Sequence, residues 1–175
     1  MRKEESGAPE DALRQTRSGK GKTPSRRGSL LAEAVAALAR REYARAELRR
    51  KLRRRFPDSA EPELEAVLDR LESLGYLSDE RFAEKFVRQK GGRLGAARLR
   101  MELRQRGVPA EAAEAALSQL GGTEEERAYQ VWSKKFGNLP EDERERGRQI
   151  RFLLSRGFGY SIIRDVFDRA RRGLD

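Results

Sequence analysis

The sequence contains no cysteine and no histidine in 175 residues. Without cysteine the chain can form no disulfide bond and has no thiol nucleophile, which fits a reducing compartment. Without histidine it lacks the most common metal ligand and the most common general base of enzymes. We therefore expect no metal site, no cofactor and no catalytic residue, and we predict that the protein is not an enzyme.

Long apolar runs and nucleotide-binding motifs are also missing. No stretch reaches the roughly 18 apolar residues that a transmembrane helix requires, and the first residues lack the apolar segment of a secretory signal. There is no G-x-x-x-x-G-K-[S/T] phosphate loop, and the serines of GSLLAEA and SKKFG have no histidine to activate them. These absences favour a cytoplasmic protein that neither enters a membrane nor hydrolyses a nucleotide itself.

What the sequence has in abundance is charge, most of it positive. Lys and Arg number 39 against 29 Asp and Glu, which gives a formal net charge of +10, and only 37% of the residues are hydrophobic. Such a chain is too polar for one thick core, so we expect stacked small modules. The positive excess favours a polyanionic partner, which is most often nucleic acid.

Residues 1–28 have the composition of a flexible basic tail. They are rich in Gly, Ser, Pro and charge, and they contain eight basic against four acidic residues. Two interpretations stay open for this segment. It is either a solubilising extension or a loose electrostatic arm that contacts nucleic acid.

From residue 29 onward the pattern predicts helices only. Ser29 is placed to cap the first helix, and Thr123 with Glu126 has the spacing of a capping box. Gly75 and Gly107 are placed to end helices. No segment alternates valine, isoleucine and threonine as a β-strand would. We predict an all-α fold of about nine helices.

Similar basic segments recur roughly every 50 residues, which indicates a repeat architecture. They read LRRKLRRRF, LRMELRQRG and IRFLLSRGF, and each is followed by one further helix. The sequence therefore predicts tandem modules of three short helices. We place module 1 at residues 29–77, module 2 at 78–121 and module 3 at 122–175.

The register between the second and third copies stays open by one residue. One alignment matches the apolar stripes and makes Met101 equivalent to Phe152. The other matches the two Arg-Gly pairs and sets the offset between the copies one residue shorter. The positions involved are Leu99 and Leu103 over Ile150 and Leu154 in the first alignment, and Arg106-Gly107 over Arg156-Gly157 in the second.

Charge follows the same repeat. Residues 29–57 hold nine basic and three acidic side chains, whereas residues 58–77 hold one and six. Residues 78–107 hold nine and four, and residues 108–126 hold none and five. Part of this contrast is attraction within a module, which contributes little per exposed pair. The remainder leaves one basic middle helix in each module.

The segment REYARAELRRKLRRR, residues 41–55, carries eight of these basic residues. On a helical wheel Ala44, Leu48 and Leu52 form one narrow stripe, so most of the circumference is exposed. Arginine outnumbers lysine, which suits planar contacts to phosphate or carboxylate. A solvated face is the alternative, but the feature recurs in the later copies. We predict that arginines of these three helices contact the partner: Arg45, Arg49, Arg50, Arg53, Arg54, Arg98, Arg100, Arg104, Arg106, Arg148, Arg151 and Arg156.

Longer segments of the sequence resemble the RecX family of bacterial recombination regulators. They are LDRLESLGYLSDERFAEKFVRQK (68–90), LRMELRQRGV (99–108) and RQIRFLLSRGFGYSIIRDVF (148–167). The most specific piece is GYLSD followed by RFA, and the resemblance covers residues 30–172.

This resemblance implies an elongated, curved protein of tandem three-helix modules. It implies a non-enzymatic regulator that binds the RecA recombinase filament on single-stranded DNA and inhibits its assembly, strand exchange, ATP hydrolysis and SOS coprotease activity. The ATP is then hydrolysed by RecA, and the resemblance brings no catalytic residue to this chain. We expect a monomer, with direct DNA binding as a further expectation.

Two other interpretations stay open. The first is a stand-alone nucleic-acid-binding helical-repeat protein without sequence specificity, because the basic helices contain few of the Asn, Gln and Ser side chains that read bases. The second is a scaffold of helical repeats that binds other proteins and does not bind nucleic acid. Stacking on single-stranded bases is poorly supported, because aromatic residues are not interleaved with the basic runs and Trp132 is predicted to lie in a core.

Overall fold

The computed structural model describes residues 29–173, so the predicted tail at 1–28 lies outside the described residues. The described part contains nine α-helices and no strand, which confirms the predicted all-α fold. The helices are α1 (Leu30–Leu38), α2 (Arg45–Arg55), α3 (Glu61–Ser73), α4 (Asp79–Lys90), α5 (Ala96–Arg106), α6 (Ala110–Ser118), α7 (Glu124–Lys135), α8 (Glu143–Ser155) and α9 (Tyr160–Arg172).

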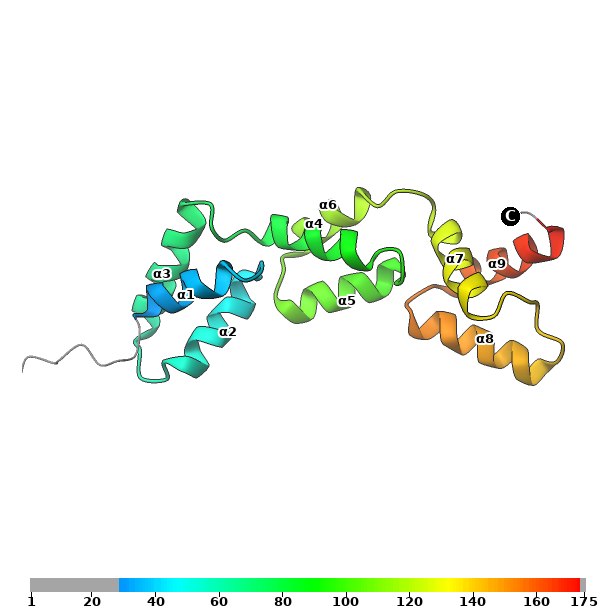
Figure 1. Ribbon diagram of the computed structural model, residues 1–175, viewed down its shortest axis with the longest axis horizontal. Helices are drawn as coiled ribbons and strands as arrows, with labels where there is room; N and C mark the ends of the chain where they lie inside the picture. Colours follow the sequence, from blue (N-terminus) through cyan, green and yellow to red (C-terminus); the bar gives the residue numbers. More distant parts are fainter. Residues whose placement is uncertain (1–28, 174–175) are drawn as a thin grey trace, which may run out of the picture.

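The helices form a row of three groups, each around its own small hydrophobic core (Figure 1). We call them cluster 1 (α1–α3), cluster 2 (α4–α6) and cluster 3 (α7–α9). The row is elongated, and its lower edge in the view is concave because α5 is set back between α2 and α8 (Figure 1). Ala44, at the start of α2, packs into the core of cluster 2 and so links two clusters. The residue limits of the three modules stay a prediction.

Local sequence signals set several helix ends. The Ser29 side chain accepts the N–H of Ala32 at 3.2 Å. Thr123 and Glu126 form the predicted capping box, in which each side chain accepts the other residue's backbone N–H. These contacts satisfy N–H groups that have no partner within their helices, and they confirm the predicted caps.

Two glycines with positive φ bring successive clusters close together. Gly107 follows α5 with φ 85°, and Gly157 follows α8 with φ 88°. A Cβ at Gly107 would overlap the side chain of Ala46 in α2, and a Cβ at Gly157 would overlap Arg98 in α5. The end of each later middle helix therefore lies directly against the preceding middle helix.

We call each of these contacts between successive middle helices a joint. The repeated joint settles the register that the sequence left open. Gly107 and Gly157 are equivalent, and Leu103 and Leu153 are both fully buried. The alignment of the two Arg-Gly pairs is therefore correct. The stripe-based alignment is wrong, and so is the equivalence of Met101 and Phe152.

Matching the apolar stripes gave the wrong alignment because one buried position of α8 is polar. Gln149 is fully buried, accepts the indole N–H of Trp132 at 2.7 Å and donates to the Asn138 carbonyl at 3.2 Å. These bonds satisfy an amide that would otherwise be costly to bury. Trp132 is 2% exposed, so the prediction that it lies in a core is confirmed.

The first two middle helices are capped by a neighbouring cluster. The N–H of Arg45, at the start of α2, donates to the Asp79 carboxylate of α4 at 2.7 Å. The N–H of Ala96, at the start of α5, donates to the Glu124 carboxylate of α7 at 2.8 Å. Helix α8, after which no further cluster follows in residues 29–173, is capped by its own Asp142. These caps tie each cluster to the next.

Candidate polyanion interface

The basic middle helices α2, α5 and α8 lie along the same side of the molecule, the lower edge in Figure 1. The acidic third helices α3 and α6 lie above them in that view. This arrangement follows from the repeated joint, because each middle helix is held against the one before it. The twelve predicted contact arginines all belong to these helices or to the residue that follows one of them.

In cluster 1 three of the predicted arginines are paired with acidic side chains of α3. Arg45 bonds to Glu65 at 2.5 Å and to Asp69 at 2.7 Å, and it also pairs with Glu72. Although partial burial lowers the pKa of Arg45, its hydrogen bonds to Asp69 and Glu65 raise that pKa above the ordinary value. Hydrogen bonding from Arg45 in turn lowers the pKa of Glu65.

The next turns of α2 continue this series of ion pairs with α3. Arg49 bonds to Glu65 at 2.7 Å and pairs with Glu61, and Arg53 also pairs with Glu61. Although most of the circumference of α2 was expected to be exposed, Arg49 and Arg53 both turn toward α3. Their charge is partly neutralised within the cluster, as the charge pattern predicted.

In cluster 2 three further arginines have internal partners. Arg100 bonds to Glu114 of α6 at 2.6 Å. Arg98 and Arg106 both approach Glu102, at 3.2 and 3.7 Å, and Lys90 bonds to the same carboxylate at 3.0 Å. Burial raises the pKa of Glu102, but these cations outweigh it and the net pKa is lowered.

The other six predicted arginines have no carboxylate within ion-pair distance in residues 29–173. Arg50 donates to the carbonyls of Gln105 and Arg106 at the end of α5, where the helix dipole favours a cation. Arg148 and Arg156 lie over the rings of Phe136 and Phe152. The six are Arg50, Arg54, Arg104, Arg148, Arg151 and Arg156.

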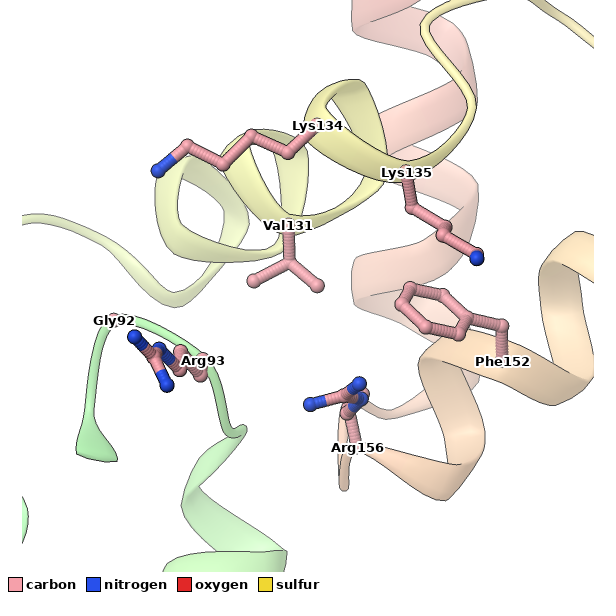
Figure 2. A pocket seen from close by; sticks show the side chains of 7 residues that line it. All are labelled: Gly92, Arg93, Val131, Lys134, Lys135, Phe152 and Arg156. Carbon is pink, nitrogen blue, oxygen red and sulfur yellow. The ribbon is translucent and has the colours of Figure 1, made fainter.

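Three cations outside the predicted contact set line a hollow together with Arg156 (Figure 2). They are Arg93, in the loop between α4 and α5, and Lys134 and Lys135, at the end of α7. Aligning the three copies of the repeat around their joints would have brought these positions together. Single-helix wheels do not, because the cations come from three different elements.

The described residues contain no group of three or more Asp, Glu, His or Cys side chains that could hold a metal ion. Within the same part of the chain, no helix combines the length and apolar character needed to cross a membrane.

Fold and site together define an elongated helical-repeat protein with a basic row of middle helices. Two family models match the chain, described as the second and the third three-helix domain of RecX, at residues 78–117 and 123–167. Regulatory protein RecX of Leptothrix cholodnii is 46% identical over 79% of this chain and 87% of the relative. Regulatory protein RecX of Chromobacterium violaceum is 48% identical over 79% and 88%. The chain belongs to the RecX family of regulatory proteins.

Solved structures agree on the fold. The crystal structure of RecX from Lactobacillus salivarius superposes with a TM-score of 0.67 at 20% identity, covering 80% of this chain and 93% of that one. A second crystal structure of regulatory protein RecX gives 0.65 at 23% identity, covering 79% and 72%.

Proposed function

We propose that this protein binds the RecA recombinase filament on single-stranded DNA and inhibits filament assembly, strand exchange, ATP hydrolysis and SOS coprotease activity. It modulates DNA recombination and repair in this way, works in the cytoplasm as a monomer, and uses no catalytic residue or cofactor. The observation that supports this proposal is a RecX-family chain whose basic middle helices lie along one side (Figure 1).

The proposed mechanism is multivalent binding. A filament presents phosphate and acidic side chains repeatedly along its length, and the three middle helices are spaced along an elongated body (Figure 1). Each helix alone would bind weakly. Once one helix is bound, the others face their sites at high effective concentration, so the assembled contact is tight. A protein that spans neighbouring recombinase subunits in this way would hinder their addition and their conformational cycle.

Within this surface the six arginines without an internal carboxylate are proposed as the principal contacts. Their charge is not already neutralised, so it is available to an external anion. All six paired arginines contribute to the electrostatic field. Arg45, Arg49 and Arg53 also hold α2 on α3, and Arg100 holds α5 on α6. All twelve predicted contact residues remain part of the proposed surface.

The proposal is tested by RecA ATP hydrolysis on single-stranded DNA. We expect substoichiometric amounts of this protein to lower the steady-state rate, because each bound molecule affects a stretch of filament rather than one subunit. Sedimentation of RecA on the same DNA should show less assembled filament. An unchanged rate at equimolar protein would contradict the proposal.

The alternative is a stand-alone nucleic-acid-binding protein, favoured by the net charge of +10. A salt titration separates the two. Strong binding to naked duplex with a steep salt slope, together with no preference for RecA-coated strands, supports the alternative. Preference for RecA-coated strands over naked DNA supports the regulator.

A further inference from the structure

Each of the two joints between clusters contains a hollow beside the start of a middle helix. The first hollow lies between clusters 1 and 2 and has a volume of about 450 Å³. The second lies between clusters 2 and 3 and has a volume of about 370 Å³. Figure 2 shows the side chains of Val131, from α7, and Phe152, from α8, near the loop that carries Arg93. The two hollows are copies of one feature, but their charges differ.

The repeat places a basic residue in the second hollow where the first has an acidic or neutral one. Glu42 stands two residues before the N-cap of α2, and Arg93 stands two residues before the N-cap of α5. Helix α4 ends in Gln89-Lys90, and α7, which has the same length, ends in Lys134-Lys135. Arg93 thus replaces a glutamate, and Lys134 replaces a glutamine.

A third difference removes the internal counter-ion. In cluster 2 the guanidinium of Arg106 lies near Glu102, one turn earlier in α5. The equivalent arginine of cluster 3 is Arg156, and one turn earlier in α8 stands Phe152. The guanidinium of Arg156 therefore lies over an aromatic ring, 5.1 Å from its centroid, instead of beside a carboxylate.

Four cations and two carboxylates line the first hollow, so its positive charge is partly neutralised, whereas that of the second is not. Glu42 pairs with Arg81, and Glu47 pairs with Arg41. Around the second hollow stand Arg93, Lys134, Lys135 and Arg156, and no carboxylate lines it. None of these four cations has an ion pair within the part of the chain that the structure describes. Four like charges around one hollow repel each other, and an external anion would relieve that repulsion.

We propose that the second hollow binds the phosphodiester backbone of a DNA strand. A phosphodiester group exposes oxygens that accept hydrogen bonds from several directions, and the donors here come from a loop and two helices. Base stacking is not part of the site, because the Phe152 ring is already in contact with two other side chains. Its centroid lies 5.3 Å from that of Phe136, and the Arg156 guanidinium lies over it. Binding is therefore independent of base sequence and is the same in kind for single strands and duplex.

This inference deepens the proposed function by naming one DNA-contact site, but its test contains no RecA. A failure of RecA inhibition and a failure of phosphate binding are therefore separate results. The test variant combines Arg93→Glu with Lys134→Gln, which gives these two positions the residues of their equivalents in the first hollow, Glu42 and Gln89. Both side chains are exposed, so folding should be preserved, as judged by circular dichroism and the thermal midpoint.

The measurement is anisotropy of labelled single-stranded and duplex DNA against salt concentration. We expect the variant to bind both forms about tenfold more weakly at moderate salt, with the salt slope reduced in magnitude by about 2, because two phosphate contacts are lost. The matched control, Arg88→Glu with Arg70→Gln, makes the same change in net charge at exposed residues of α4 and α3, away from the hollow and from the middle helices. It should keep its affinity within about twofold, as long-range charge effects are screened.

Equal losses in variant and control would overturn the inference, since net charge alone would then explain binding. A loss that depends on base sequence would also overturn it. So would a variant that keeps DNA affinity but loses affinity for poly-glutamate, because the hollow would then bind acidic polypeptide. The pair Lys134→Ala and Lys135→Ala provides a second variant and should reproduce the loss on DNA.

Discussion

Neighbouring arginines of one helix differ in what they contact. Arg53 pairs with an acid of α3, whereas Arg54, the next residue, has no carboxylate partner in the described part of the chain. The sequence predicted that the segment would be basic and that the third helices would attract it. It could not predict which arginine turns inward, because that depends on how α3 packs against α2.

Gly157 illustrates a residue whose role is visible only in the structure. It combines positive φ with a close approach to Arg98, so Gly157→Ala should destabilise the protein by about 2 kcal/mol or more. Chemical denaturation followed by the fluorescence of Trp132, which lies in cluster 3, measures the change in the free energy of unfolding.

Gly159 supplies the matched control. It caps α9 in an extended conformation, and a Cβ there would contact nothing within 4 Å. Gly159→Ala should therefore cost well under half as much as Gly157→Ala. Equal costs at the two positions would contradict the close packing of clusters 2 and 3.

At the scale of the helix, some starts are encoded locally and others are not. Ser29 and the Thr123–Glu126 box could be predicted because the capping side chain lies within three residues of the N–H that it accepts. The caps of α2 and α5 could not be predicted in this way, because each carboxylate comes from the next cluster. The sequence pattern of a single segment carries no information about contacts with another cluster.

Removing one of these distant caps should loosen a helix in another cluster. We expect Asp79→Ala, in α4, to speed hydrogen exchange at the Arg45 amide of α2 and to lower stability by about 1 kcal/mol. Exchange measured by NMR at single amides reports this directly.

Glu80→Ala is the control for that experiment, because it removes a charge from the same first turn of α4 without touching the Arg45 amide. It should leave exchange at Arg45 unchanged. If both variants accelerate exchange equally, the effect belongs to the dipole of α4 and the proposed tie between clusters fails.

Across the whole molecule, the sequence predicted more of the architecture than of its joints. Repeat length, helix number and the basic middle helices followed from apolar spacing and charge. The register did not, because the buried position of α8 is the polar Gln149, and the apolar residue beside it, Ile150, is only partly buried. The second hollow was missed for a related reason, since its cations meet only when two clusters are in place.

The side formed by α2, α5 and α8 is proposed to contact the RecA filament. We expect charge reversal at two unpaired positions, Arg54→Glu with Arg104→Glu, to raise the amount of protein needed for half-inhibition of RecA ATP hydrolysis by about tenfold or more, because repulsion replaces attraction on two middle helices. The matched control reverses Arg70 and Arg88, which are exposed on α3 and α4.

The most direct test is therefore a titration of both variants and the unmodified protein against RecA on single-stranded DNA, with helicity and thermal midpoint checked for each. We expect weakened inhibition by the Arg54/Arg104 variant and near-normal inhibition by the control. Full inhibition by the Arg54/Arg104 variant, or equal weakening of both, would contradict a filament contact along the middle helices.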